Sequence, residues 1–312
     1  MQESEILVSV VIPTYSRNIT LTRAIDSVLV QTHKNLEIIV VDDNPPDSEW
    51  RISTQKIMRQ YADNDKIRYI QNPQNMGGSG ARNEGIKAAK GEYIAFLDDD
   101  DEYFPEKVEK QLRCFLNTTQ EKLALVFCDA VMTYDNDKFV CYAKPRYKGC
   151  CLFEAMADNC LAATSQWMAK KAALIDVGMF TIVPCKQDFT LILKLLVEGY
   201  EVDCVPEVLS KYCNYQADRI SNISQKKLEG EMLYMDTCRK HFSKLTDNQI
   251  EQVEFNFSKR KYELYNDMNI RQQAKYEARK MIEIDCKESL VYFVKRKIQL
   301  GKYHLKKKLL CR

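Results

Sequence analysis

The most chemically suggestive residues are four consecutive aspartates, Asp98–Asp101, which directly follow the apolar run Tyr93–Leu97. Adjacent carboxylates repel one another, so this arrangement costs stability unless a cation lies nearby. Oxygen-rich sites of this kind suit Mg²⁺ or Mn²⁺, which also take phosphate oxygens and water as ligands. A divalent ion between these carboxylates and a diphosphate would neutralise charge on a leaving group. The alternative is a solvated loop that caps the helix near Pro105.

Two further polar segments follow apolar runs. Thr14-Tyr15-Ser16-Arg17 ends the run that begins at Val8, and Asp42-Asp43-Asn44 ends the run Leu36–Val41. In an open α/β sheet, ligands bind at the carboxyl ends of the strands, near the switch in strand order. We therefore expect these two segments and the four aspartates to lie together. For Asp42 and Asp43 alone, turn formation competes with ligand binding as an explanation.

A glycine-rich segment, Asn75–Gly80, precedes Ala81-Arg82-Asn83. Its spacing matches neither the P-loop pattern nor the dinucleotide-binding fingerprint. Alone it would be a flexible turn, and only its polar neighbours make it a candidate part of a ligand site.

Alternating strands and helices must position these segments. Nearly continuous apolar runs are typical of parallel strands covered on both faces, and they occur at 8–13, 36–41, 67–70, 93–97 and 123–128. Helical patterns separate them, with Thr20 as the expected N-cap of the first helix and Pro105 in the first turn of a later one. This order predicts a doubly wound, mostly parallel sheet flanked by helices.

The second half of the chain is less regular. An apolar helix is expected at Asp188–Glu198 and a strand at Glu201–Val205. From Gln225 the sequence is polar, charged and helix-prone. We therefore expect a ligand-binding domain over residues 1–224 and a helical, basic extension over residues 225–312.

The bulk composition limits the classes of function. The 312 residues carry a net charge of only +2, which does not point to a nucleic-acid partner. The 12 cysteines include no C-x-x-C pair and there are only three histidines, so a zinc site is not expected. No secretory signal precedes the first strand, and we expect unpaired thiols in a reducing cytoplasm.

Several segments together resemble the family 2 glycosyltransferases. They are Val-Ile-Pro-Thr-Tyr-Ser-Arg (11–17), Val-Val-Asp-Asp-Asn (40–44), Asn-Met-Gly-Gly-Ser-Gly-Ala-Arg-Asn-Glu-Gly (75–85) and Gly-Glu-Tyr-Ile-Ala-Phe-Leu-Asp-Asp-Asp-Asp (91–101). The match is dense from about Ser9 to Leu116 and thinner to about Asn222. The resemblance implies a GT-A fold and, for most members, a reaction that inverts the sugar carbon.

The resemblance also implies roles for particular residues. Asp43 would accept a hydrogen bond from uracil, and Arg17 and Arg82 would lie near the diphosphate. Asp98 and Asp100 match the outer positions of the Asp-x-Asp motif that holds Mn²⁺ or Mg²⁺, with Asp100 as the direct metal ligand. The full set implied to bind the nucleotide sugar is Pro13, Thr14, Tyr15, Arg17, Asp43, Arg82, Asp98 and Asp99.

The catalytic base in similar enzymes is an acid at the start of a later helix. Asp188 matches that position, while Gln187 stands where a glutamate is usual. The chemistry needs one carboxylate near the acceptor hydroxyl to take its proton. The alternative is that Asp188 only caps its helix. Tyr215 stands where relatives often carry a histidine, and Trp167 would either stack on an acceptor sugar or belong to the core.

The end of the chain is strongly basic. Residues 287–312 hold nine Lys or Arg and one acid, a charge of +8, which leaves 2 − 8 = −6 for residues 1–286. Apolar and cationic residues interleave there, as in a helix on an anionic membrane surface. We expect peripheral membrane contact through this tail, which would place a cytoplasmic enzyme beside a lipid-linked acceptor. The alternative is a solvated charged helix, or one docked on the acidic remainder of the chain.

The sequence therefore predicts a metal-dependent transferase of sugars from a nucleotide sugar, with a UDP-sugar favoured, to a hydroxyl of a glycan or lipid-linked glycan in polysaccharide synthesis. One alternative is a non-catalytic sugar-nucleotide binding protein, which the changes at Gln187 and Tyr215 would favour. Another is a nucleotidyltransferase, which would need a glycine-rich loop after the first strand where Pro13-Thr14-Tyr15 stands.

Overall fold

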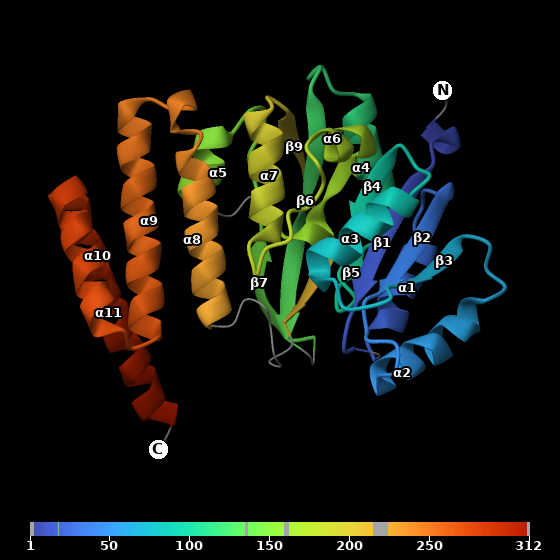
Figure 1. The fold of residues 1–312 in the computed structure, drawn as a ribbon, viewed down its shortest axis with the longest axis horizontal. Helices are drawn as coiled ribbons and strands as arrows, with labels where there is room; N and C mark the ends of the chain where they lie inside the picture. The colour runs from blue at the N-terminus through green and yellow to red at the C-terminus, as the bar shows by residue number, and fades with distance from the viewer. Residues whose placement is uncertain (1–2, 18, 135–136, 159–161, 215–223, 311–312) are drawn as a thin grey trace. The chain divides into compact units, whose positions relative to one another are not determined.

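The computed structural model describes residues 3–17, 19–134, 137–158, 162–214 and 224–310, with side chains placed as far as residue 298. Two compact units divide the chain (Figure 1): Met1–Ala155 with Asn159–Ile220, and Met156–Asp158 with Ser221–Arg312. The first is built on a sheet and the second on helices. Tyr215 lies outside the described residues, so the structure gives no account of it.

One mixed sheet forms the first unit. Its strands are β1 Val8–Thr14, β2 Leu36–Asp42, β3 Ile67–Gln71, β4 Tyr93–Phe96, β5 Glu102–Tyr103, β6 Leu123–Tyr134, β7 Phe139–Ala143, β8 Met168–Lys170 and β9 Glu201–Asn214. They lie in the order β3-β2-β1-β4-β8-β6-β9-β5, and β7 pairs with β6. The β3-β2-β1-β4 block is parallel, as is β6 with β9, whereas β5, β7 and β8 run antiparallel to their neighbours. The predicted mostly parallel sheet is confirmed.

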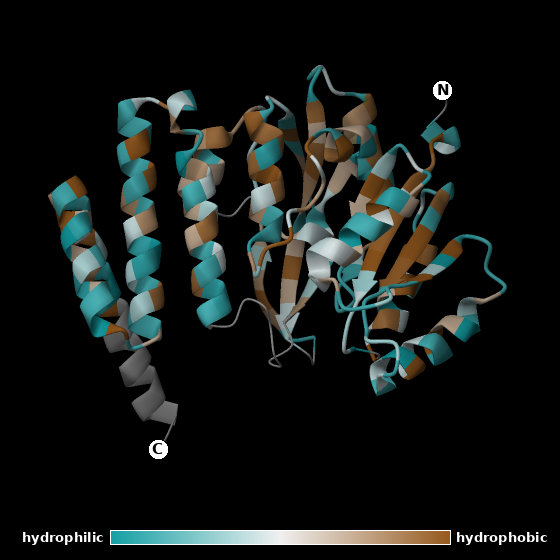
Figure 2. Cartoon of the chain, viewed as in Figure 1, coloured by the Kyte–Doolittle hydropathy of each residue, from teal (hydrophilic) through white to brown (hydrophobic). Residues whose placement is uncertain are grey.

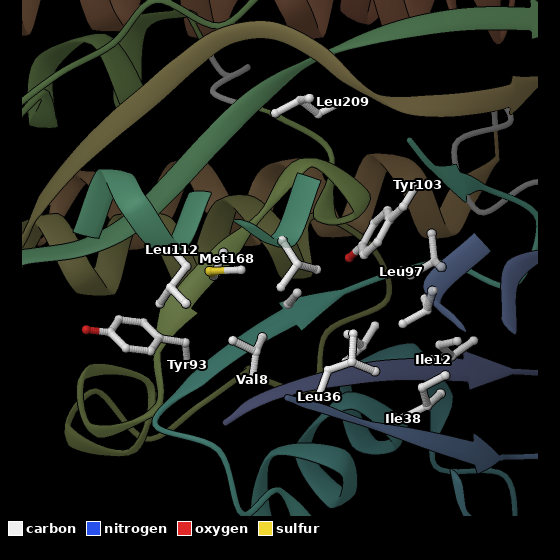
Figure 3. Packing of buried hydrophobic residues seen from close by; sticks show 14 of the residues in the cluster. Val8, Ile12, Leu36, Ile38, Tyr93, Leu97, Tyr103, Leu112, Met168 and Leu209 are labelled. Carbon is white, nitrogen blue, oxygen red and sulfur yellow. The ribbon is translucent and has the colours of Figure 1, made fainter. Parts of the chain in front are cut away.

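Helices cover both faces of this sheet. They are α1 Leu21–Leu29, α2 Glu49–Met58, α3 Gly77–Ala88, α4 Lys107–Leu116, α5 Leu152–Asp158, α6 Lys171–Asp176 and α7 Gln187–Val197, with short 3-10 turns η1 Glu3–Glu5, η2 Arg59–Tyr61 and η3 Thr164–Gln166. Val10 and Ile12 of β1 pack in one buried cluster with Ile25 of α1. Figure 3 shows part of this cluster, including Ile12. Val11 points to the opposite face, where a β-carbon on Gly85 of α3 would collide with it.

The strands of the sheet are rich in apolar residues (Figure 2). Burying Val, Ile and Leu side chains contributes about 1.5–3 kcal/mol each, and the middle of β1 and β2 has no exposed surface. This buried parallel block holds the polar residues at its carboxyl end in fixed register, with Thr14 opposite Asp42.

Some local expectations need correction. Thr20 occupies the N-cap of α1, but its side chain makes no capping hydrogen bond. α4 begins at Lys107 rather than around Pro105, and α3 already begins inside the glycine-rich segment, at Gly77. β6 and β9 continue past Cys128 and Val205 because the two strands pair in parallel along their whole length, with irregular register near Asp129.

The second unit consists of helices α8 Gln225–Arg239, α9 Asp247–Asp267, α10 Arg271–Ile284 and α11 Cys286–Leu310, with the 3-10 turn η4 Phe242–Lys244. Thr246 and Gln249 form a capping box at the start of α9. A buried ion pair of 2.6 Å joins Lys261 of α9 to Glu277 of α10. Within the described part of the chain, none of the helices combines the length and apolar character needed to cross a bilayer.

Candidate active site

The polar ends of β1 and β4 meet at the carboxyl edge of the sheet. Thr14 Oγ1 donates a buried hydrogen bond of 2.7 Å to Asp99 Oδ2. Arg17 Nη1 lies 3.6 Å from Asp99 Oδ1 and also forms an ion pair with Asp100. Pro13 is partly buried beside them, whereas the Tyr15 side chain is 48% exposed. The structure thus joins the first strand end to the four aspartates.

Arg82 reaches the same edge from α3. Its guanidinium pairs with Asp98 and donates to Thr164 Oγ1 at 3.4 Å. Thr164 in turn donates to the Asp98 carboxylate at 3.2 Å. Arg82 is buried. Two guanidinium groups, those of Arg17 and Arg82, therefore form ion pairs with the aspartate cluster.

Electrostatics show that these cations do not balance the cluster. Burial, followed by the charge on Asp100, raises the pKa of Asp99 to about 7. Burial and the charges on Asp100 and Asp98 raise the pKa of Asp101 well above its usual value. Burial acts to lower the pKa of Arg17, but Asp100 and Asp99 outweigh it and the pKa rises. Four carboxylates face two guanidinium groups here, and a further cation would relieve the remaining repulsion.

The donor set fits a divalent ion that is only partly held by protein. Among the described residues, no three or more His, Cys, Asp or Glu side chains gather to hold a metal by themselves. Mg²⁺ usually binds through one or two carboxylates, substrate phosphates and water. Asp100 and Asp98 could supply those carboxylates, since their side chains keep 12% and 29% of their surface exposed.

Asp43 is buried at the ends of β2 and β3. Its Oδ1 accepts from Asn72 Nδ2 at 2.7 Å and from the Met76 N–H at 2.9 Å. Burial raises the pKa of Asp43, although these hydrogen bonds act in the opposite direction. Asp42 instead forms the turn, because its Oδ1 accepts from the Asn44 N–H at 2.9 Å. The two adjacent aspartates therefore differ in their contacts: Asp42 bonds within the turn, whereas Asp43 bonds to Asn72 and Met76.

Arg51 of α2 links the ends of β2 and β3, and no sequence pattern singled it out. Its Nε lies 3.1 Å from Asp42 Oδ2, and its Nη2 donates to the carbonyls of Asn44 and Asn72, the latter at 2.8 Å. Arg51 and Asp42 are both buried. One guanidinium fork therefore fixes the ends of β2 and β3, including Asn72, the hydrogen-bond partner of Asp43.

Asp188 lies at the start of α7, near Arg82. A β-carbon on Gly78 would lie 3.0 Å from Arg82 Nη1 and 3.6 Å from Gln187 Nε2, so α7 begins beside α3. Burial raises the pKa of Asp188, against the Phe189 N–H and the charges of Lys186 and Arg82. Lys186, with φ of 65°, occupies the N-cap, but Asp188 Oδ1 accepts from the Phe189 N–H at 3.0 Å in the first turn, so the capping alternative stays open. The Asp188 side chain is partly exposed.

Two residues distant in sequence support the aspartates. Ser165 Oγ accepts from the Asp98 N–H at 3.0 Å and donates to Asp101 Oδ2 at 2.6 Å. Asp101 Oδ1 also accepts from the Cys213 N–H at 3.0 Å. No pattern in the sequence links the turn η3 to these aspartates, because the contact depends on the antiparallel insertion of β8 beside β4.

Trp167 belongs to the core. Its side chain has no exposed surface, its ring stacks at 6.3 Å on Phe180, and its Nε1 donates to the Ala162 carbonyl at 3.3 Å. It therefore offers no face to an acceptor sugar in this structure, and the predicted acceptor contact is not supported.

Comparisons with known proteins bear on the family and the fold of the chain. The model of glycosyl transferase family 2 matches residues 9–154. An uncharacterized glycosyltransferase of Methanocaldococcus jannaschii is 30% identical over 226 residues, which cover 71% of this chain and 76% of that protein. UDP-Glc:alpha-D-GlcNAc-diphosphoundecaprenol beta-1,3-glucosyltransferase WfaP of Escherichia coli is 32% identical over 193 residues, 62% of this chain and 71% of that protein.

Coverage differs among relatives. An uncharacterized glycosyltransferase of Rickettsia bellii is 40% identical over 139 residues, which cover 45% of this chain but only 19% of that protein.

The crystal structure of S. aureus TarS 1-349 in complex with UDP-GlcNAc aligns with a TM-score of 0.59 at 16% identity, covering 89% of this chain and 88% of that one. This likeness shows a shared, GT-A-type fold.

The chain therefore belongs to glycosyl transferase family 2, whose members transfer sugars. The family and the fold expected from the motifs are confirmed.

Proposed function

We propose that this protein is an inverting glycosyltransferase that moves a sugar from a UDP-sugar to a hydroxyl of a glycan or lipid-linked glycan during polysaccharide synthesis. The observation that carries the proposal is the position of Asp188: it starts α7 beside Arg82, which pairs with Asp98 of the aspartate cluster. A base for the acceptor and the groups suited to a diphosphate are thus neighbours.

The residues divide the reaction between them. Asp43 would accept a hydrogen bond from uracil, and Pro13, Thr14 and Tyr15 would line the nucleoside. Asp100, with Asp98, would hold Mn²⁺ or Mg²⁺, which would neutralise charge on the leaving diphosphate. Arg17 and Arg82 would pair with diphosphate oxygens, the geometry that guanidinium groups favour.

Asp188 would perform the proton transfer. Its carboxylate takes the proton of the acceptor hydroxyl while the hydroxyl oxygen bonds to the anomeric carbon. The bond from that carbon to the diphosphate oxygen breaks on the opposite side, and the nucleoside diphosphate leaves with the electron pair. In-line displacement inverts the carbon. Asp188 ends protonated and returns its proton to solvent.

The acceptor is proposed from a relative. WfaP of Escherichia coli is described as acting on alpha-D-GlcNAc-diphosphoundecaprenol. A similar acceptor here would place the enzyme at the cytoplasmic face of an anionic membrane, and the basic segment 287–312 supports such contact.

Transfer itself tests the proposal. The protein is incubated with UDP-, GDP- and dTDP-sugars, Mn²⁺ or Mg²⁺, and a lipid diphosphate-linked GlcNAc, and products are analysed by mass spectrometry and NMR. We expect one UDP-sugar to be transferred with inversion. Metal-dependent donor binding without transfer to this acceptor or to lipid-linked glycan extracts would favour the non-catalytic binding protein instead.

The pH profile provides a prediction about Asp188. Because burial raises its pKa above the ordinary value of 3.8, the group holds its proton to a higher pH than an exposed aspartate. Activity should therefore rise with pH through this raised pKa, since only the ionised form accepts a proton. The measurement is kcat/KM against pH at saturating metal; the residual rate of Asp188→Asn should lack this acidic limb.

Arg51 provides a prediction about donor affinity. Arg51→Lys keeps the charge but loses the fork that joins Asp42, Asn44 and Asn72, so Asp43 loses its fixed partner. We expect UDP to bind about tenfold more weakly, in line with one lost charge-assisted hydrogen bond. Calorimetric titration measures this, with Arg59→Lys on exposed η2 as the matched control. Equal UDP affinity in both variants would refute the role.

A further inference from the structure

α11 has two different faces along its described first half. One face packs on α9: Tyr292 Oη donates to Glu263 Oε1 at 2.8 Å, and the rings of Tyr292 and Phe293 meet Tyr262 edge-on. Arg296 lies on the same side, 3.9 Å from Asp267. These contacts fix the rotation of the helix about its axis and decide which residues face away from α9.

The opposite face is apolar and exposed. Leu290, Val291, Val294 and Ile298 keep 65%, 45%, 50% and 54% of their surface exposed. At 3.6 residues per turn these four positions fall within an arc of about 100°. We refer to these four residues as the apolar stripe of α11. Only a lipid surface or another molecule could remove these apolar side chains from water.

Lysines flank the stripe. Lys295 and Lys297 lie on its two sides by helical rotation, and Lys287 lies one turn before it, all three exposed. In the described part of the chain no acidic side chain pairs with these three lysines, whereas Arg296, on the inner face, is paired. Glu288, also exposed, is the one acid among residues 286–298, so the exposed side of the helix keeps a surplus of positive charge. The sequence that follows adds Lys302, Lys306, Lys307, Lys308 and Arg312 without an acid.

We propose that the apolar stripe of α11 with its flanking lysines is a docking face for an anionic lipid surface. Apolar side chains would enter the boundary between headgroups and acyl chains, while the lysines reach anionic headgroups, as in helices that lie in the membrane plane. Charge complementarity selects this occupant, because a second copy of the same face would bring like charges together. The inference deepens the membrane contact proposed above and gives it particular residues.

Vesicle binding by the full chain tests the inference without requiring turnover. Co-sedimentation is measured with vesicles of phosphatidylcholine alone and with added phosphatidylglycerol. We expect binding to the anionic vesicles only, weakened about fivefold for each lysine neutralised in Lys295→Gln and Lys297→Gln. Val294→Asp should weaken it about tenfold or more, because a charge then enters the apolar boundary. Ile175→Asp is the matched control, since Ile175 is 53% exposed on α6 of the other unit.

Several outcomes would overturn the inference: no binding to anionic vesicles, equal binding by Val294→Asp and Ile175→Asp, or loss of self-association instead of vesicle binding in Val294→Asp, which would show that a second copy covers the stripe. Circular dichroism checks that each variant is folded. Nucleotide release by the same variants is measured separately, so failure of docking and failure of the transferase proposal are distinguishable.

Discussion

Replacing Asp188 with asparagine is expected to remove sugar transfer while donor binding remains. Asparagine keeps the size of the side chain but cannot accept the proton of the acceptor hydroxyl. Loss of a general base costs about 10²–10⁴ in rate, so we expect kcat to fall about a thousandfold with little change in the Kd for UDP. Steady-state kinetics and calorimetric titration measure the two quantities.

The control for this variant is Asp176→Asn at the end of α6, where Asp176 accepts from Tyr200 Oη at 3.0 Å, away from the aspartate cluster. Its kcat should stay close to that of the native protein. If Asp188→Asn kept native kcat, the base would have to be another group. If it lost UDP binding as well, its role would be structural.

Replacing Asp100 with alanine is expected to remove both activity and the effect of metal on donor binding. Asp100 is the proposed direct ligand and also the partner of Arg17. Stabilisation of leaving-group charge by a metal is worth several kcal/mol, so kcat/KM should fall about a thousandfold. Mn²⁺ should strengthen UDP binding by the native protein and not by the variant, as measured by calorimetry with and without EDTA.

Thermal unfolding distinguishes this effect from damage to the fold. Mn²⁺ with UDP should raise the Tm of the native protein, since a ligand that binds only the folded state stabilises it. The Asp100→Ala variant should have a Tm close to the native one without metal, because loss of the ion pair with Arg17 offsets removal of a repelling carboxylate. Metal-dependent activity that survives in this variant would refute the assigned ligand.

The motif-bearing half of the fold could be predicted from the sequence because buried parallel strands have continuous apolar patterns. The runs ending at Pro13, Val41 and Leu97 each became a strand of the parallel block. The sequence also indicated that the segment after the first strand would lie near the four aspartates, and Thr14 and Asp99 are joined by a hydrogen bond.

Contacts made by later segments could not be predicted in this way. Ser165 donates to Asp101 because β8 pairs antiparallel with β4. Gln187 comes near Gly78 because α7 begins beside α3. The position of Trp167 could not be predicted from the sequence either. An aromatic residue in a weakly patterned segment suits a sugar-binding surface and a core equally well, and packing on Phe180 decided for the core.

Arg51 shows why the surroundings of Asp43 could be predicted only in part from the sequence. A charged residue in a polar helix is most often solvated, and nothing adjacent in sequence indicates that it is buried. Its partners, Asp42 and the Asn72 carbonyl, belong to two different strand ends. Only the three-dimensional arrangement shows that this residue supports the predicted uracil-binding aspartate.

Nucleotide release is the most direct test of the central proposal. UDP formed from the preferred UDP-sugar with acceptor is measured for the native protein, Asp100→Ala and Asp188→Asn, each with Mn²⁺ and with EDTA. We predict metal-dependent release by the native protein and loss of release in both variants, with UDP binding kept by Asp188→Asn. Release that persists in EDTA, or in Asp188→Asn at the native rate, would contradict the proposed mechanism.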